Sequence, residues 1–322
     1  LHCWWGFAVG ATYERGSWAE GLTTFQADYG VAEDQGPDAA RDMRVGWIRA
    51  LAQLSDDQRE PLSAFRSSTH NGSQVEGYGK AAMVFHMLRD ELGTAAVQGG
   101  IRGFYATNRG AIAAWADLQT AVETAAGKDL AWFFDQWINE AGMPNLQLQA
   151  GDVTRGEDGT YQAALKLPQT APAYRLSVPV VIETVDGPIK QHMNVSGLSH
   201  EAVITLPTEP ISVQLDPDFD LVRHPLAGEL APTLRSIKGQ TLVAFATSPS
   251  GGEGAIAAAL EPILSGASVT WQDELDIAYD GPKLVVGSAD ELADLRPDAL
   301  GPMPENVGQS ATSLWIERDQ MG

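Results

Sequence analysis

The sequence predicts a multidomain α+β protein: a mainly helical portion, then an antiparallel β domain, then a small α/β layer. Apolar residues recur at helical spacing up to about residue 145, and the spacing changes to strand-like alternation from Leu146. After about Lys238, buried-strand patterns alternate with helical ones, as in small α/β layers. The expected divisions are 1–145, 146–228 and 238–322, the last being incomplete at its C-terminal end.

Helices are the main feature of residues 1–145. Val75–Leu92 places Ala81, Ala82, Phe85, Leu88 and Leu92 on one stripe, and Gly93 is a natural helix stop. Further helices are expected at Asp117–Ala126 and Asp129–Glu140, and loops at Asp34–Asp38 and Ser67–Ser73. Pro144 then bars continuation of the last helix. The opening LHCWWGF is as apolar as the middle of a buried helix, so we expect the true beginning of the polypeptide to lie upstream.

The β domain is indicated by short alternating segments and turn signals. LQLQAGDV, TYQAALKLP, YRLSVPVVIET and IKQHMNV have strand character, and Asp158-Gly159 and Asp186-Gly187 are typical hairpin turns. In the last layer, strands are expected at TLVAFA, KLVVG and SLWIE. The loop Gly251–Gly254 sits between a strand and a helix but lacks the lysine of a phosphate loop, which favours an ordinary βα turn.

Composition limits the classes of function. The chain has 322 residues, with 42 acidic against 21 basic side chains and a net charge of −21. Such a charge disfavours nucleic acid and anionic membrane surfaces as partners. Cys3 is the single cysteine, which excludes an intrachain disulfide and a thiolate zinc cluster, and no apolar run is long enough to span a membrane. An acidic, cysteine-poor, tryptophan-rich chain favours a periplasmic or otherwise exported bacterial protein over a cytoplasmic one.

His2 and Glu20 are the candidate metal ligands. In a helical His-Glu-x-x-His motif, two imidazoles one turn apart reach a single Zn²⁺ and the intervening glutamate acts as base. Leu1 and His2 match the last two positions of that motif, and Glu20 begins a second expected helix from which a carboxylate could be the third ligand. Two histidines and a carboxylate leave one coordination position open for water. The alternative is a core histidine with one satisfied hydrogen bond.

Tyr78, just before the stripe of the 75–92 helix, is the candidate catalytic side chain. A phenol there could donate a hydrogen bond to the oxyanion formed when water attacks a peptide carbonyl. The alternative is an ordinary aromatic residue at the start of a helix. The other prominent aromatics have helical spacing and are expected in the core: Trp115, Trp132, Phe133, Phe134 and Trp137.

Three ordered motifs resemble one known family. HCWWG followed by WAEGLTTF resembles the HxWxG…WxxEG core of the M1 aminopeptidases, gluzincins with a thermolysin-like catalytic domain. GYGKAAMVFHML is similar to that family's YxKGA…ML helix, and WADLQTAVETAAGKDLAWFFDQWINEAGMPNL to the ending of its catalytic domain. The resemblance covers about 1–150, and the following β stretch is compatible with the family's next domain.

The resemblance implies that His2 and Glu20 bind Zn²⁺ and that Tyr78 stabilises the tetrahedral intermediate of peptide hydrolysis. It places the first histidine, the general base and the motif that grips the substrate's free amine upstream of Leu1. The sequence departs from the family in a loop one residue shorter between histidine and glutamate, in Ala19 for an asparagine, and in Gly79 for an acidic residue. Ala19 removes a possible hydrogen bond that would orient the ligand.

Two function classes therefore stay open. The first is a zinc metallopeptidase of the M1 type, most simply an aminopeptidase acting on peptides. The second is a non-catalytic relative that uses the peptidase fold as an interaction scaffold. A weaker third hypothesis, binding of a small molecule or partner by residues 240–322, rests only on the glycine loop. The sequence does not indicate an oligomeric state.

Overall fold

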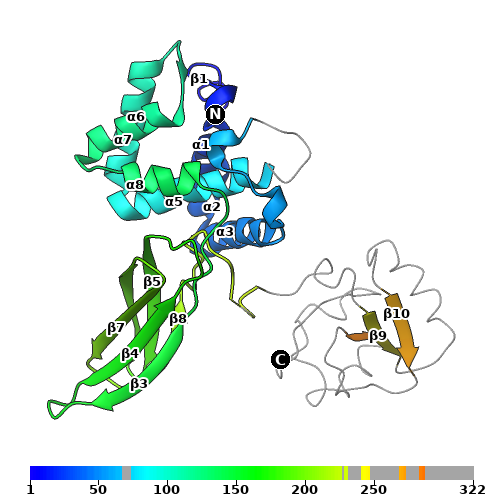
Figure 1. Ribbon diagram of the computed structural model, residues 1–322, viewed down its shortest axis with the longest axis vertical. Helices are drawn as coiled ribbons and strands as arrows, with labels where there is room; N and C mark the ends of the chain where they lie inside the picture. Colours follow the sequence, from blue (N-terminus) through cyan, green and yellow to red (C-terminus); the bar gives the residue numbers. More distant parts are fainter. Residues whose placement is uncertain (67–73, 227, 231–240, 247–267, 273–282, 287–322) are drawn as a thin grey trace. The chain divides into compact units, whose positions relative to one another are not determined.

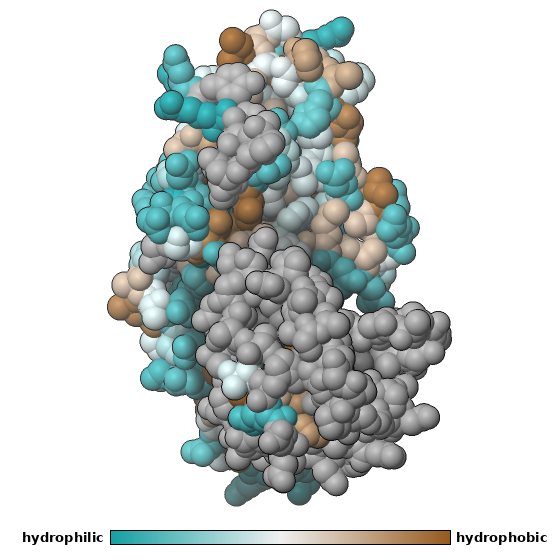
Figure 2. Space-filling view, turned by 90° about the vertical axis from the view of Figure 1, so that its right-hand side faces the viewer, coloured by the Kyte–Doolittle hydropathy of each residue, from teal (hydrophilic) through white to brown (hydrophobic). Residues whose placement is uncertain are grey.

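The computed structural model describes residues 1–66, 74–226, 228–230, 241–246, 268–272 and 283–286. It forms two compact units, Leu1–Leu226 and Ala227–Gly322, which are described separately. In the described residues, helices are combined with antiparallel sheets, so the predicted mixed α+β class is confirmed. Figure 1 shows the helices of the first unit gathered beyond one end of the long strands that follow them in sequence. On the face shown in Figure 2, the coloured surface mixes hydrophilic and apolar residues.

The first part of this unit is helical up to residue 139. Its α-helices are α1 (Ala19–Thr24), α2 (Gly30–Gln35), α3 (Pro37–Ala52), α5 (Ala81–Leu92), α6 (Thr94–Asn108), α7 (Trp115–Ala126) and α8 (Ala131–Phe134). Among the described residues, three π-helical segments join or extend them: η2 (Phe25–Tyr29), η5 (Val75–Lys80) and η6 (Asp135–Asn139). Single 3₁₀ turns are η1 (Tyr13–Arg15), η3 (Asp56–Gln58) and η4 (Leu62–Ala64). The short strands β1 (Gly10–Ala11) and β2 (Ile112–Ala113) pair in parallel.

The predicted helix over Val75–Leu92 forms, but as a π-helical turn followed by α5. The expected stripe is wider than its pattern suggested, because every residue from Ala81 to Leu88 is buried. A helix buried on all sides lies inside the helical core rather than on its surface. The expected core aromatics are also buried, except Trp132, whose ring is half-buried and lies 4.1 Å below the Arg175 guanidinium.

One of the two loop predictions is wrong, and the other is not tested. Asp34–Asp38 is not a loop, because α2 runs to Gln35 and α3 begins at Pro37, with Gly36 alone between them at a φ of 132°. Proline is pre-organised for the first position of a helix, so one glycine suffices for the break. Ser67–Ser73 lies outside the described residues.

The opening segment is not the interior of a buried helix either. It consists of turns, and its apolar side chains are exposed except Trp5. Gly6, at a φ of 101°, redirects the chain after Trp5. The Trp5 ring packs edge-on against Trp18, and its indole N–H donates to Gln26 at 2.7 Å.

Two three-stranded antiparallel sheets follow. The first has the order β3-β4-β7 and the second β6-β5-β8. The strands are β3 (Gln149–Arg155), β4 (Tyr161–Pro168), β5 (Leu176–Thr184), β6 (Gly187–Val195), β7 (Ser199–Leu206) and β8 (Pro210–Leu215). The predicted turns at Asp158-Gly159 and Asp186-Gly187 join antiparallel neighbours. Alternate residues of β4 and β5 are buried, which is the pattern of sheets with one face towards a core.

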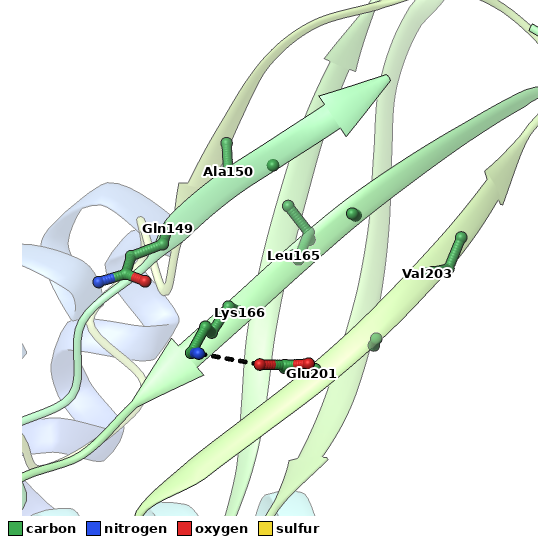
Figure 3. Close-up of a pocket in the computed structure, with 9 residues that line it drawn as sticks. Gln149, Ala150, Leu165, Lys166, Glu201 and Val203 are labelled. Atoms are coloured by element: carbon green, nitrogen blue, oxygen red, sulfur yellow. Dashed lines mark ion pairs between the residues drawn. The ribbon is translucent and has the colours of Figure 1, made fainter. Parts of the chain in front are cut away.

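A hollow of about 370 Å³ lies over β3, β4 and β7 (Figure 3). The residues that line it include the small Gly151 and Ala164. The only charged side chains that line it are Lys166 and Glu201, which face one another in an exposed ion pair of 2.9 Å. The hollow therefore offers little for acid–base or metal chemistry.

The segment after β8 joins the two-sheet domain β3–β8, called the sandwich below, to the helices. Arg44 of α3 donates to the carbonyl oxygen of Asp218, from Nη2 at 2.9 Å and from Nε at 3.2 Å. Arg41 donates to the carbonyl of Pro217 at 3.1 Å. Within the same segment, Asp216 and Arg223 form an ion pair of 2.9 Å in which both side chains are completely buried.

In the second unit the described strands are β9 (Thr241–Ala246), β10 (Ser268–Gln272) and β11 (Lys283–Val286), which form a parallel sheet in the order β10-β9-β11. The strands expected at TLVAFA and KLVVG are confirmed, and β10 was not predicted. The predicted glycine loop at 251–254, the helix expected after it and the expected SLWIE strand lie outside the described residues.

None of the helices in the described ranges has both the length and the apolar character needed to cross a bilayer.

Candidate functional site

The structure brings His2 and Glu20 together. His2 lies in the opening turns and Glu20 is the second residue of α1. The imidazole Nε2 is 3.4 Å from a Glu20 carboxylate oxygen. The His2 side chain is 54% exposed and that of Glu20 18% exposed, so solvent reaches the pair from the histidine side. Trp18, just before α1, anchors the start of this helix by donating its indole N–H to the Ala113 carbonyl at 2.8 Å.

Tyr78 joins the same pair from a different helix. It lies in the middle of η5, and its hydroxyl is within hydrogen-bonding reach of the Glu20 carboxylate. Burial, together with the hydrogen bond and negative charge of Glu20, raises the pKa of Tyr78 to about 12. The phenol therefore keeps its proton at neutral pH and acts as a hydrogen-bond donor. The Phe65 ring packs edge-on against it, with the ring centroids 6.1 Å apart.

A close approach of two helix backbones explains why Glu20 and Tyr78 meet. Gly21 of α1 faces Ala81, the first residue of α5, and a Cβ at position 21 would lie 2.3 Å from the Ala81 Cβ. Only a glycine lets the two helices approach so closely. Because Glu20 and Tyr78 are near neighbours of these contact residues in sequence, the contact sets the separation of the carboxylate and the phenol.

We expect Gly21→Ala to destabilise the protein and to weaken the contact between Glu20 and Tyr78. Overpacking a fully packed position typically costs about 1–3 kcal/mol. The matched control is Gly46→Ala inside α3, where an added Cβ meets nothing within 4 Å and helix propensity should stabilise the protein by roughly 0.5–1 kcal/mol. Urea unfolding measures both changes. A Gly21→Ala variant as stable as the Gly46→Ala variant would contradict this account.

The pair fits a single metal ion by its donor chemistry and its spacing. Imidazole nitrogen and carboxylate oxygen are both zinc ligands, each at about 2.0–2.2 Å from the ion. Two such ligands on a tetrahedral ion lie about 3.4 Å apart, and the observed separation of the two atoms is 3.4 Å. The same separation suits a weak ion pair, so the spacing permits a metal without requiring one.

A second group of potential ligands lies between α5 and the segment after β8. His86, Asp90 and Asp220 offer ligand atoms that all lie within 4.8 Å of one another. His86 Nε2 is 3.0 Å from Asp220 Oδ1 and 3.3 Å from Asp90 Oδ2.

The hydrogen bonds around His86 argue against a metal there. Arg44, which has only donors, donates to the Tyr29 hydroxyl. The phenolic proton of Tyr29, whose pKa is raised by burial, is then directed to His86 Nδ1 at 3.1 Å. By this assignment the hydrogen of the neutral imidazole is on Nε2 and is donated to Asp220. Nε2, the nitrogen that faces both carboxylates, then has no free lone pair for a metal. The Arg44 guanidinium, 3.2 Å from Asp220, already supplies a positive charge that balances these carboxylates.

Sequence reasoning missed this network and a second buried polar pair, Glu76 and Lys80, beside Tyr78. His86 and Asp90 lie four residues apart on one helix, a spacing that could have drawn attention to them. Asp220 follows 134 residues after His86, and no local pattern indicates that they meet. Glu76 and Lys80 also have helical spacing, but it is typical of an exposed pair, whereas both are 1% exposed.

Comparison with known proteins indicates an aminopeptidase-like relationship over part of the chain. No family model matches the sequence. A stretch of 77 residues, 24% of this chain, is 31% identical to aminopeptidase N of Lactococcus lactis subsp. lactis and covers 9% of that protein. Among solved structures, aminopeptidase A of Legionella pneumophila, in complex with aspartic acid, aligns at 21% identity and a TM-score of 0.44 over 69% of this chain and 25% of that one. The chain thus spans a small part of the proteins it resembles.

Proposed function

We propose that the protein is a zinc-dependent peptidase of the M1 type, an aminopeptidase in which His2 and Glu20 bind the metal and Tyr78 is catalytic. One observation carries the proposal: two separate helical segments bring a carboxylate to 3.4 Å from an imidazole and within hydrogen-bonding reach of a phenol. The similarity to aminopeptidase N supports a peptidase that removes N-terminal residues.

Each of the three residues would have a separate role in the reaction. His2 and Glu20 would hold the ion, and Zn²⁺, when bound, supplies Lewis-acid chemistry to water and to the substrate carbonyl. The half-exposed His2 leaves an approach from solvent for the substrate. Tyr78 would turn its hydroxyl from Glu20 to the carbonyl oxygen of the scissile bond and donate a hydrogen bond as negative charge develops there.

The substrate class and the cellular location of the protein are inferred from the chemistry of the site and from composition. We propose peptides as substrates, since an oxyanion donor beside a metal pair suits hydrolysis of an amide. The net charge of −21 disfavours nucleic acid. We also propose an exported location, which the acidic, cysteine-poor composition favours over the cytoplasm.

The alternative is a non-catalytic scaffold with the same fold. A scaffold has no physical need for an imidazole, a carboxylate and a phenol in contact, because such a polar group adds desolvation cost without added packing. The contact of all three side chains therefore favours the enzyme.

Metal analysis tests the proposal directly. The protein, expressed from its complete coding sequence, should bind about one Zn²⁺ per chain. We expect His2→Ala and Glu20→Gln each to lower zinc affinity by at least 10–100-fold, the loss typical even of residues that only orient the ligands. Peptidase activity should fall with the metal.

Two controls separate ligand loss from general damage. His192→Ala and Glu201→Gln make the same kinds of change on the sandwich, where His192 contacts Ser177 and Glu201 pairs with Lys166. Both should keep zinc and activity. Undiminished zinc binding in His2→Ala and Glu20→Gln would refute the assigned ligands, and a wild-type protein without zinc would favour the scaffold.

A further inference from the structure

A buried polar cluster lies beside Tyr78 in the same π-helical turn. Glu76 and Lys80 of η5 are each 1% exposed. A Glu76 carboxylate oxygen accepts a hydrogen bond of 2.7 Å from the backbone N–H of Glu60. The Lys80 ammonium donates to the backbone carbonyl of Glu140, just after η6, at 3.5 Å. The two side chains thus tie η5 to two segments distant in sequence.

This arrangement is costly. Burial raises the pKa of Glu76 and lowers the pKa of Lys80 to about 8, while the attraction between the two opposes both shifts. The second carboxylate oxygen of Glu76 has no hydrogen-bond partner among the described residues. Replacing a buried charged pair by apolar side chains of similar size often leaves a protein equally stable or makes it more stable. Stability alone therefore does not explain why charged residues occupy these buried positions.

The geometry of η5 suggests that role. Tyr78 lies midway between Glu76 and Lys80, and residues two apart on a helix point to different sides. Tyr78 accordingly reaches Glu20 while its neighbours contact Glu60 and Glu140. The π-helical register is fixed where the Ala81 N–H bonds the Glu76 carbonyl, five residues earlier. Such single π-turns recur at functional sites.

The rest of η5 is held by neighbouring rings rather than by side chains of its own glycines. Gly77 and Gly79 flank Tyr78, and neighbouring rings lie directly on their backbone: added Cβ atoms would be 2.2 Å from the Phe65 ring and 3.0 Å from the Trp47 ring. Because these positions have no side chains, the orientation of the turn depends on ring-to-backbone packing and on the polar contacts of Glu76 and Lys80.

We propose that Glu76 and Lys80 are positioning residues, which hold the π-helical turn so that the Tyr78 hydroxyl faces Glu20. The catalytic consequence rests on the proposed function, whereas the orientation of Tyr78 does not. Glu76 acts through the N–H of Glu60 and Lys80 through the carbonyl of Glu140, so the turn is held from two segments.

A spectroscopic experiment tests the positioning without any assay of activity. 3-Fluorotyrosine is placed at position 78 of the protein expressed from its complete coding sequence, and its ¹⁹F signal is recorded for wild type, Lys80→Met, Glu76→Gln and the double variant. The double variant removes both buried charges, so it should fold even if Lys80→Met does not. We expect a single narrow signal in wild type and a shifted or broadened signal in the variants. Lys128→Met, which removes a surface lysine paired with Glu91, should leave the signal unchanged. A wild-type signal in the folded double variant would overturn the proposal.

Kinetics provide the second measurement. Lys80→Met, or the double variant in its place, should lower kcat by about 10–100-fold, the scale of a misplaced catalytic group, while KM and zinc content stay within about twofold. In a Tyr78→Phe background the same change should have little further effect, because residues that act through one another are not additive. An equal loss in both backgrounds would show a general structural role and overturn the proposal. If Tyr78→Phe itself has no effect, the proposed function fails, while the ¹⁹F result still decides the positioning.

Discussion

Tyr78→Phe should lower kcat by about 100–1,000-fold, with little change in KM, in the protein expressed from its complete coding sequence. This corresponds to roughly 3–4 kcal/mol of transition-state stabilisation, the usual effect of removing one oxyanion donor. The loss falls on kcat because the hydroxyl would interact with charge that develops only during the reaction. Steady-state kinetics on a chromogenic amino-acid amide measures it.

Phenylalanine is the right substitution because it keeps the ring that packs against Phe65 and removes only the hydroxyl. The matched control is Tyr161→Phe in the sandwich, where the ring lies 5.6 Å below the Arg155 guanidinium and where we expect no change in kcat. Zinc content should be unaltered in both variants. Normal turnover of Tyr78→Phe would remove the catalytic role proposed for this residue.

Arg223→Met should lower the free energy of unfolding by about 3–5 kcal/mol, because it leaves the Asp216 carboxylate buried without its counter-charge. Both side chains are 0% exposed and their charged atoms are 2.9 Å apart. Burial raises the pKa of Asp216, while Arg223 and the backbone N–H of Asp220 oppose that rise. The guanidinium also donates to the carbonyl oxygens of Leu215 and Asp216, and the variant removes both of these hydrogen bonds. Denaturant unfolding with an unchanged m-value measures the loss.

The exposed Lys166–Glu201 pair provides the control (Figure 3). Its separation is also 2.9 Å, but the two side chains are 45% and 71% exposed. Water screens and solvates such a pair, so Lys166→Met should leave the free energy of unfolding unchanged within error. Equal effects of Arg223→Met and Lys166→Met would mean that burial does not determine the strength of the first pair.

The sequence correctly predicted several helices and hairpins. Helical periodicity predicted a helix over Val75–Leu92, and Asp-Gly dipeptides predicted the hairpins, because both signals arise within a few residues. The same local reasoning failed at Asp34–Asp38, where polar residues and a glycine suggested a loop but Pro37 begins a helix at once.

The sequence proposed the members of the candidate site but did not indicate their geometry. His2, Glu20 and Tyr78 were found from residue type and motif spacing, and their roles as ligands and catalyst stay predictions. The motif does not indicate that Gly21 packs on Ala81 or that Glu20 accepts the phenolic hydrogen bond. Those contacts depend on how α1 packs against η5 and α5. This packing cannot be inferred from the few residues around each position.

Periodicity and residue chemistry are properties of short segments, so the sequence alone predicted the α+β class and the hairpin turns and proposed three candidate site residues. Which charges are buried, and which groups they contact, became known only from the folded structure. Glu76 with Glu60, Lys80 with Glu140, and His86 with Asp220 join residues up to 134 positions apart. Such contacts are set by packing of whole helices and strands, because desolvation and hydrogen-bond energies depend on neighbours in space rather than along the chain.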